Sequence, residues 1–301
     1  MNFFLDTGWA GIWDTSAEVA KTRQRRETRD RIPFRVSIMM NKQQLLCPVC
    51  GGNCPLLDVV DLNKSCEEAR GKYLGLSGVP VYYALCTHCG FCFAPDLSAW
   101  SLQEFSERIY NDDYASVDPD YLEARPRSNA SNLLSMFGRL PAAVRHLDYG
   151  GGNGLLAKRL RESLWNSTSY DPFVDRNLSL VELGTFDLIT AFEVFEHVPD
   201  IQRLMSDLRT LLAPSGLILF STLLSDGNLK QGQRISWWYA SPRNGHISLL
   251  SRNSLAILAE KYGFNCGSFS NAFHAFWREV PSWAAHVIRL NPPDSPPAPR
   301  P

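Results

Sequence analysis

Apolar and polar positions follow two different periods in the second half of the chain. Short apolar runs of strand length precede Asp148, occupy residues 186–194 and recur at residues 217–222. Between the last two runs, apolar residues follow the 3.6-residue spacing of a helix: Ile201, Leu204, Met205, Leu208, Leu211 and Leu212. Strands that alternate with helices in this way predict an α/β fold, with a doubly wound parallel sheet covered by helices on both faces.

The segments that flank this pattern also contain predictable elements. Residues 96–140 are expected to be mainly helical, because their apolar residues share helical faces. A strand is expected at residues 79–85 and a strand pair within residues 264–277. The helix before that pair should begin after Ser251, a good N-cap residue, and end at Gly263.

Five segments follow from these patterns. A basic lead-in (residues 1–45) and a proline-rich tail (residues 286–301) are expected to be disordered. Between them lie a cysteine module (residues 46–95), a helical linker or cap (residues 96–140) and the α/β domain (residues 141–285). The arginines of the lead-in leave a second interpretation open, an arm for nucleic acid or a partner.

The composition is that of an ordinary globular protein. The 301 residues are 45% hydrophobic and carry a formal net charge of -1, so the chain has no global field that would attract nucleic acid. No apolar run approaches the roughly 20 residues of a membrane span, and the N-terminus lacks the pattern of a signal peptide. We therefore expect a cytoplasmic protein without a membrane segment; the sequence leaves the oligomeric state open.

Four of the eight cysteines form two pairs of the same design. Cys47 and Cys50 are followed by a glycine, and so are Cys86 and Cys89. A Cys-x-x-Cys-Gly turn directs two thiolates at one ion, so two such turns can supply a tetrahedral Zn²⁺ site. Four protein ligands leave no open position for chemistry, which predicts a structural zinc. Other potential ligands in the module have no such spacing: Cys54, Cys66, His88 and Cys92.

The most informative stretch is a glycine-rich turn after the first strand of the α/β pattern. Asp148 is followed by Gly150, Gly152 and Gly154, and a helical pattern begins directly after them. Such a strand–turn–helix lets the backbone approach a ligand closely and directs helix N–H groups at it. A dinucleotide fingerprint would need glycine in place of Leu155. Asp148 suits a ligand with a cationic amino acid end better than one that presents phosphate.

An acidic residue ends the next short strand, as a nucleoside site requires. Asp171 lies at the end of residues 167–171. A carboxylate in this position can accept hydrogen bonds from both hydroxyls of a ribose. Asp175 is the alternative for the same role.

Several segments resemble the class I S-adenosylmethionine-dependent methyltransferases. The Asp148-x-Gly-x-Gly-x-Gly154 turn resembles motif I of that family, residues 186–200 its FDxI…EVxEHVxD segment, and residues 211–217 its LLKPGG turn. Residues 245–255 resemble a GHxSxxSxxSL segment of one branch. The resemblance implies a Rossmann-like fold and S-adenosyl-L-methionine as cofactor, with these binding residues: Asp148, Gly150, Gly152, Gly154, Asp171 and Glu193.

The cysteine module resembles the N-terminal zinc module of the sugar C-methyltransferases, but the chain departs from the family in places. The segment between Asp171 and Phe186 is too short for the usual helix and strand, and the usual adenine-contacting aspartate after the third strand is absent. Gly245 stands where the sugar enzymes have a glutamate, so their base chemistry carries over only in part.

The resemblance also implies candidates for catalysis. His246 matches the catalytic histidine of the sugar enzymes, and His197 is a second candidate for a general base. Glu193, Glu196 and His197 resemble a segment that binds a divalent ion in quinone O-methyltransferases, which indicates a candidate Mg²⁺ site. The alternative is that Glu196 and His197 cap the following helix.

Aromatic residues indicate where an acceptor could bind. Residues 237–251 contain two tryptophans, a tyrosine and Arg243 in an expected loop, where they could contact the acceptor. Tyr110 and Tyr114, ahead of the glycine turn, are further candidates for the pocket.

These observations rank the functions. The leading hypothesis is a methyltransferase that acts on a small molecule such as a sugar or secondary metabolite. The alternative is an RNA methyltransferase that binds through the zinc module and basic arm, although residues 46–95 lack the basic excess of a nucleic-acid surface. A cofactor-binding scaffold without catalysis and a nicotinamide dehydrogenase remain further alternatives.

Overall fold

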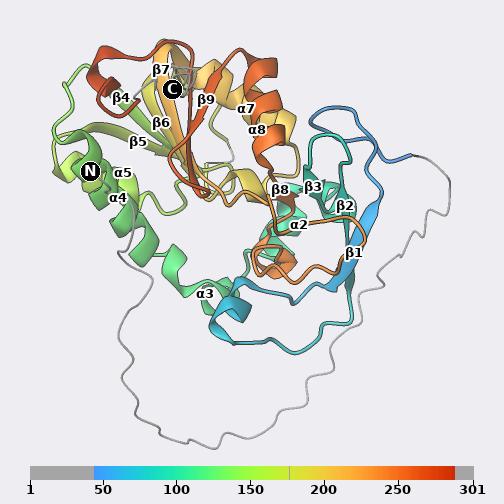
Figure 1. Cartoon of the computed structure of the whole chain (residues 1–301). Helices are drawn as coiled ribbons and strands as arrows, with labels where there is room; N and C mark the ends of the chain where they lie inside the picture. The colour runs from blue at the N-terminus through green and yellow to red at the C-terminus, as the bar shows by residue number, and fades with distance from the viewer. Residues whose placement is uncertain (1–43, 176, 289–301) are drawn as a thin grey trace, which may run out of the picture. The chain divides into compact units, whose positions relative to one another are not determined.

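The computed structural model describes residues 44–175 and 177–288, all of which belong to one compact unit (Figure 1). The segments expected to be disordered, residues 1–45 and 286–301, lie almost entirely outside the described residues. Within the described part of the chain, no helix has the length and apolar character needed to cross a membrane.

The larger of the two sheets in the described residues is the framework of the predicted α/β domain. Its strand order there is β5-β4-β6-β7-β10-β9. The first four in this order run parallel, β10 is antiparallel to β7, and β9 is antiparallel to β10. The strands are β4 (Arg145–Tyr149), β5 (Asn166–Tyr170), β6 (Phe186–Phe192), β7 (Leu212–Ser221), β9 (Asn265–Ser268) and β10 (Phe273–Trp277). The α/β prediction is confirmed, together with the strand pair expected near the C-terminus.

Helices cover both faces of this sheet (Figure 1). On one face lie α4 (Ala124–Phe137) and α5 (Leu155–Glu162), and on the other lie α7 (Ile201–Leu211) and α8 (Arg252–Tyr262). The stripe of α7 that faces the sheet is the one predicted from its spacing, and its buried residues are Ile201, Leu204, Met205, Leu208 and Leu211. This doubly covered sheet is the predicted architecture.

Side-chain caps fix where the longer helices begin. Asp200 begins α7, because its carboxylate accepts hydrogen bonds from two backbone N–H groups of the first turn. Ser251 begins α8 and forms a capping box with Ser254. Gly263 ends that helix in the left-handed conformation, with φ 73°. Both ends of α8 therefore lie where the sequence predicts them.

One boundary differs from the expectation, and one short segment agrees with it. The helical spacing of the sequence continues to Leu212, but α7 ends at Leu211, because Leu212 is extended and pairs with Phe186 as the first residue of β7. The described residues between Asp171 and Phe186 contain only the one-turn helix α6 (Leu180–Leu183). As a result, β5 is the edge strand of the described sheet.

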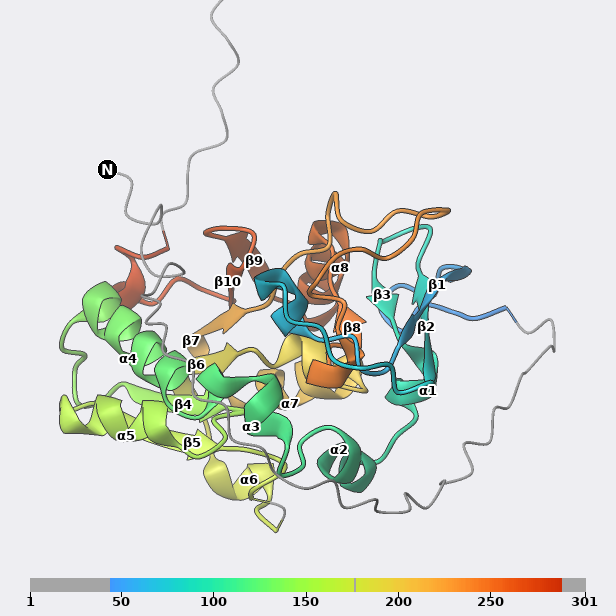
Figure 2. The ribbon, with the colours of Figure 1, turned by 90° about the horizontal axis from the view of Figure 1, so that it is seen from below.

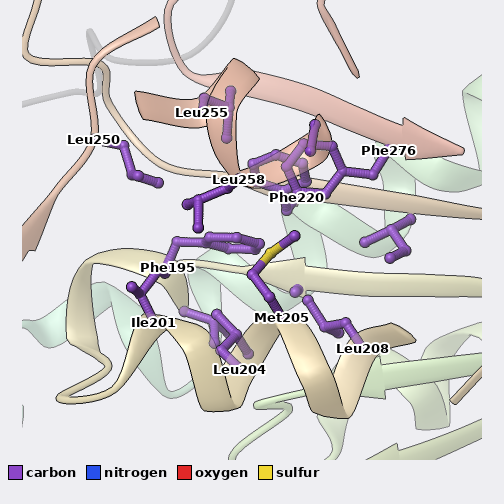
Figure 3. Close-up of a cluster of buried hydrophobic side chains, with 14 of the residues drawn as sticks. Phe195, Ile201, Leu204, Met205, Leu208, Phe220, Leu250, Leu255, Leu258 and Phe276 are labelled. Carbon is purple, nitrogen blue, oxygen red and sulfur yellow. The ribbon is translucent and has the colours of Figure 1, made fainter. Parts of the chain in front are cut away.

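The core between α7, α8 and the sheet holds the segment that precedes His197 (Figure 3). Phe195 stacks on Phe220 of β7 with ring centroids 4.3 Å apart, and Phe220 lies 4.6 Å from Phe276 of β10. Aliphatic side chains complete the cluster: Met205, Leu208, Leu255 and Leu258. Full burial of a side chain of this size contributes about 1.5–3 kcal/mol, so the backbone that carries His197 is firmly anchored.

The second sheet joins the cysteine module to a distant loop (Figure 2). It contains β1 (Leu56–Asp61), β2 (Pro80–Leu85) and β3 (Cys92–Phe93) of the module. Its last strand is β8 (Ser248–Leu249), which comes after β7 in the chain and pairs antiparallel with β3. Backbone hydrogen bonds therefore tie the module to the loop that contains His246.

Short helices connect the module to the α/β domain. They are α1 (Pro95–Ser98), α2 (Leu102–Arg108) and α3 (Tyr114–Val117). Ser101 begins α2 with a capping box to Glu104. The described 3₁₀ helices cover Cys66–Arg70, Pro119–Tyr121, Phe195–His197, Pro242–Asn244 and Ser282–Ala284.

Candidate active site

The glycine turn connects β4 to α5 through a backbone that only glycine adopts readily. Gly150, Gly152 and Gly154 have φ angles of 74°, 53° and 71°. A Cβ atom on Gly150 would lie 2.5 Å from a methyl group of Val194, and one on Gly151 would lie 2.3 Å from the hydroxyl of Ser169. The turn therefore needs small residues both for its φ angles and for its packing.

Asp171 is held against this turn by its own hydrogen bonds. Its Oδ2 accepts the Gly152 N–H at 2.9 Å, and its Oδ1 accepts the Phe173 N–H at 2.8 Å. The Asp171 N–H donates to Asp175 Oδ2 at 2.9 Å. Of the two candidate acids, Asp171 points at the turn, and Asp175 supports the backbone behind it.

A cavity of about 330 Å³ lies beside the turn. The described residues that line it include six of the eight expected cofactor and catalytic residues: Asp148, Gly150, Gly152, Asp171, Glu193 and His197. Gly154 and His246 are not among its described lining residues. Tyr110 and Tyr114 contribute to the wall as the sequence suggested.

Arg125 and Asp118 also line this cavity, and the sequence reasoning missed both. The Arg125 guanidinium donates to both oxygens of Asp118, at 3.1 and 2.8 Å. Arg125 is the only lysine or arginine among the described residues of the lining. The available signal was an arginine in the helix ahead of the glycine turn, and nothing in its spacing identified it.

Asp148 combines burial with a position at the cavity wall. Its side chain is 4% exposed, and burial raises the pKa of its carboxyl to about 7. Thr190 donates a hydrogen bond to its Oδ1 at 2.9 Å, which opposes this rise in pKa. The negative charge of Asp171 adds to the rise.

A second polar cluster adjoins the cavity at His197. The potential ligand atoms of Glu196, His197 and His246 all lie within 4.8 Å of one another. The Tyr239 hydroxyl donates to Glu196 Oε1 at 2.5 Å, whereas Oε2 is buried with no hydrogen-bond partner among the described residues. Burial and the nearby Glu193 charge raise the pKa of Glu196. Either protonation of Glu196 or a cation bound to its carboxylate would offset the free-energy cost of burying its charge.

Both histidines of this cluster are neutral at pH 7. Burial lowers the pKa of His197 to about 3, and burial also lowers the pKa of His246. His197 Nδ1 lies 3.0 Å from the Tyr110 hydroxyl, and His246 Nδ1 lies 2.8 Å from the Tyr239 carbonyl oxygen. The two imidazole rings are in edge contact, with centroids 4.7 Å apart.

Packing accounts for the glycine that precedes His246. Gly245 has a φ of 85°, and a Cβ atom there would lie 2.8 Å from the Tyr110 hydroxyl. A glutamate like that of the sugar enzymes would therefore displace Tyr110 from His197. The close contact with Tyr110 thus explains why this chain has Gly245 where the sugar enzymes have a glutamate.

Other expected residues have different surroundings. Glu193 lines the cavity, but its Oε1 accepts a hydrogen bond from Ser221 at 2.7 Å, and it is not part of the cluster around His197. Arg243 is buried and donates to the Ile109 carbonyl oxygen at 3.0 Å. Trp237 is buried in the core around the cysteine module. The loop of residues 237–251 thus uses these two side chains for packing.

The four paired cysteines form one compact cluster. Cys47 and Cys89 have their sulfurs 3.6 Å apart, and those of Cys50 and Cys86 are 3.5 Å apart. All four sulfurs lie within 4.8 Å of one another. Tetrahedral zinc with bonds of about 2.3 Å places its sulfurs about 3.8 Å apart, so this donor set fits the ion.

The spare cysteines of the module lie outside this cluster. Cys54 donates to the Gly52 carbonyl oxygen at 3.7 Å, and Cys66 lies 3.0 Å from the Ser241 hydroxyl. Cys92 is buried in β3. The two Cys-x-x-Cys-Gly pairs therefore supply the compact set by themselves.

In comparison with known proteins, this chain is similar to methyltransferases. Residues 121–268 match the model of a family described as a methyltransferase domain. The ubiquinone biosynthesis O-methyltransferase of Colwellia psychrerythraea is 35% identical over 91 residues, which are 30% of this chain and 37% of that protein. The enzyme of the same name from Paraburkholderia xenovorans is 37% identical over 57 residues, 19% of this chain and 25% of that protein. The chain thus spans well under two thirds of these curated relatives.

Solved structures of methyltransferases share limited similarity with this chain. The 1,6-didemethyltoxoflavin-N1-methyltransferase of Burkholderia thailandensis, with bound S-adenosylhomocysteine, has a TM-score of 0.42 and 17% identity, covering 70% of this chain and 99% of its own. The plantazolicin methyltransferase BpumL, also in complex with S-adenosylhomocysteine, has a TM-score of 0.41 and 13% identity, covering 62% of this chain and 95% of its own.

The cysteine cluster generates a prediction about metal content. We expect the purified protein to hold about one zinc ion per chain, and we expect Cys89→Ser to lose it. The same substitution should lower thermal stability, because loss of the ion would loosen the turn whose Cys89 carbonyl oxygen accepts a hydrogen bond from Ser251 at the start of α8. Elemental mass spectrometry and a thermal melt measure both effects. Cys266→Ser, outside the cluster, is the matched control and should keep its zinc; zinc-free wild-type protein would contradict the assignment.

Proposed function

Residues 121–268 of this chain form a class I S-adenosylmethionine-dependent methyltransferase domain, and from this premise we propose that the protein transfers the methyl group of S-adenosyl-L-methionine to a small-molecule acceptor. The observation that carries the proposal is that the glycine turn, Asp148 and Asp171 line one cavity together with His197. Groups suited to the cofactor and a neutral proton acceptor therefore line the same cavity.

Three side chains around the turn have the chemistry to hold the cofactor. Asp171 would accept the two ribose hydroxyls, because each carboxylate oxygen keeps a lone pair after it accepts one backbone N–H. Asp148 would accept hydrogen bonds from the ammonium group. Arg125 would bind the carboxylate of the cofactor, since a guanidinium pairs well with carboxylates.

The rate of methyl transfer would depend mainly on alignment. Bound S-adenosyl-L-methionine supplies an activated methyl group on a sulfonium. The glycine turn fixes one reactant, and the aromatic wall fixes the other at in-line distance, which can provide much of the acceleration. The buried side chains around His197 would also exclude water from the reacting atoms.

An acceptor hydroxyl needs a route for its proton, and the residues beside the cavity offer one. Tyr110 lines the cavity, and its hydroxyl lies 3.0 Å from His197 Nδ1. In this route the acceptor donates its proton to the Tyr110 oxygen as Tyr110 passes its own proton to His197 Nδ1. His246 lies behind His197 and would support it, so we assign the role of final proton acceptor to His197 rather than His246.

The donor set near His197 changes the expectation for a divalent ion. The expected Mg²⁺ ligands were Glu193, Glu196 and His197, but the atoms that converge belong to Glu196, His197 and His246. Two imidazoles and one carboxylate suit zinc, manganese or iron better than Mg²⁺, which prefers oxygen ligands. We infer that a divalent ion at this site, where one is used, would be a transition metal held by Glu196, His197 and His246.

The shape of the wall favours a ring-shaped acceptor. Tyr110 makes edge contacts with Tyr114 and Phe173, at centroid distances of 5.1 and 5.0 Å, and Tyr114 contacts Tyr121 in the same way. All four rings line the cavity. Sugars and phenols both present flat faces and hydroxyl groups to such a wall. We therefore propose sugars and aromatic secondary metabolites as the classes to test first.

Binding of the cofactor product tests the proposal directly. We expect S-adenosylhomocysteine to bind with micromolar affinity in a calorimetric titration, and NAD not to bind. Asp171→Ala should abolish binding, because it removes the acceptor for the ribose hydroxyls. Asp175→Ala, which removes the hydrogen bond to the Asp171 N–H, should weaken binding by less. Binding of NAD instead, or of neither ligand, would overturn the assignment of the glycine turn.

The proton route predicts a separate effect on turnover. Release of S-adenosylhomocysteine in the presence of panels of nucleotide sugars and phenols measures activity. Tyr110→Phe should lower the turnover of a hydroxyl acceptor by at least about 100-fold, the range of general acid–base catalysis. Its affinity for S-adenosylhomocysteine should stay within about threefold of wild type, and Tyr82→Phe in β2 is the matched control. Full activity of Tyr110→Phe would remove Tyr110 from the proton route.

A further inference from the structure

Four polar side chains form a continuous hydrogen-bonded chain through the interior of the main sheet. Ser167 of β5 lies 2.7 Å from His146 Nδ1, and His146 Nε2 lies 3.0 Å from the Thr190 hydroxyl of β6. Thr190 in turn donates to Asp148 Oδ1 at 2.9 Å. All four residues are buried, and the chain crosses three adjacent strands.

The donors in this chain can be ordered by counting hydrogens. Thr190 has a single hydroxyl hydrogen and gives it to Asp148, so His146 Nε2 must be the donor to the Thr190 oxygen. Burial lowers the pKa of His146 to about 3, so the ring is neutral and its Nδ1 has no hydrogen. Ser167 must then donate to Nδ1. Every donor in the chain points toward Asp148.

The chain occupies a place where apolar side chains would be the usual choice. Apolar neighbours surround it on this face of the sheet, and Trp165 packs edge-on against the His146 ring at a centroid distance of 5.8 Å. Burial of polar groups costs free energy even when they are fully bonded, and apolar residues of the same size could fill the space. The polar side chains have a purpose here if they hold the Asp148 carboxylate in one orientation.

The hydrogen-bonded chain fixes the orientation of the Asp148 carboxylate beside the glycine turn. Oδ1 is taken by Thr190, and Oδ2 lies under the turn, 2.6 Å from where a Cβ atom of Gly151 would be. Asp148 also lines the cavity. Rotation of the carboxylate would break the bond to Thr190, so the second oxygen stays directed at the ligand side.

We propose that Thr190 and His146 are positioning residues, which hold the Asp148 carboxylate ready for the ammonium group of the cofactor. This inference rests on the proposed function, since it takes the cofactor's amino acid end to lie beside Asp148. It goes beyond that function by giving the interior of the sheet a part in cofactor affinity.

The charge on Asp148 adds a dependence on pH. Its carboxyl is half ionised near pH 7 in the cofactor-free protein, owing to burial and the charge of Asp171. His146 beside it is neutral, and the remaining titratable side chains on the cavity wall are Tyr110, Tyr114, Asp118, Tyr121, Arg125, Tyr149, Glu193 and His197. An ammonium group needs the ionised form, so affinity should fall as the pH falls below about 7, up to tenfold per pH unit. Loss of the Thr190 hydroxyl would move this midpoint to higher pH.

Calorimetric titration with S-adenosylhomocysteine tests the proposal. Thr190→Val should weaken binding about 10- to 100-fold, the factor for one hydrogen bond to a charged group. Thr190→Ser keeps the hydroxyl and should stay within about threefold of wild type. Thr168→Val makes the same change at an exposed position of β5 and is the control. Wild-type affinity and an unshifted pH midpoint in a folded Thr190→Val protein would overturn the proposal.

A spectroscopic measurement on the wild-type protein tests the hydrogen-bonded chain itself. In ¹⁵N-histidine-labelled wild-type protein with S-adenosylhomocysteine, the ring nitrogens of His146 should report a neutral imidazole with hydrogen on Nε2. The His146→Gln spectrum identifies its signals among the six histidines. Hydrogen on Nδ1, or a charged ring, would overturn the ordered chain. Failure of the wild type to bind S-adenosylhomocysteine would instead overturn the proposed function, and this inference with it.

Discussion

The site depends on one constraint, the close passage of the residue 150–154 backbone over its neighbours. Gly150 packs against Val194, and Gly151 packs against Ser169 and Asp148, with no room for a Cβ atom at either position. Because the turn is pressed onto the ends of β4 and β5, its N–H groups and Asp171 are fixed relative to each other. Val194, which the turn contacts, begins the segment that carries Glu196 and His197. The contact between Gly150 and Val194 therefore fixes the glycine turn relative to the segment that carries His197.

The cysteine module constrains the acceptor side from the opposite direction. The Tyr83 hydroxyl of β2 donates to the His246 carbonyl oxygen at 2.6 Å, and β3 pairs with β8 just beyond it. The Ile247 N–H donates to the Glu196 carbonyl oxygen at 2.8 Å, which links this loop to the α/β domain. An ion bound by the four thiolates would thus stabilise the loop that contains His246, although it would take no part in the chemistry.

Motifs with a known spacing were readable in the sequence, and convergence outside such motifs was not. The glycine turn, Asp171 and the two cysteine pairs each follow a recognisable spacing, so the sequence predicted their positions even though Cys47 and Cys89 meet across 42 residues. Arg125 was missed because its place at the cavity depends on how α4 packs. Arg243 was expected near the acceptor, but it is buried and donates to the Ile109 carbonyl oxygen. The sequence around an arginine in a loop does not distinguish a packing role from a binding role. The separation of Glu193 from the cluster around His197 likewise follows from tertiary contacts, including its bond to Ser221.

Hydrogen–deuterium exchange with and without S-adenosylhomocysteine tests most directly whether the glycine turn is the cofactor site. If it is, the ligand should slow exchange at residues 150–156 and 171–174, where the turn and the Asp171 loop lie against the cavity. Residues 56–61 of the cysteine module, which do not line the cavity, should exchange at unchanged rates. Protection of the module alone, or no protection anywhere at saturating ligand, would contradict the assignment of the cofactor site to the glycine turn.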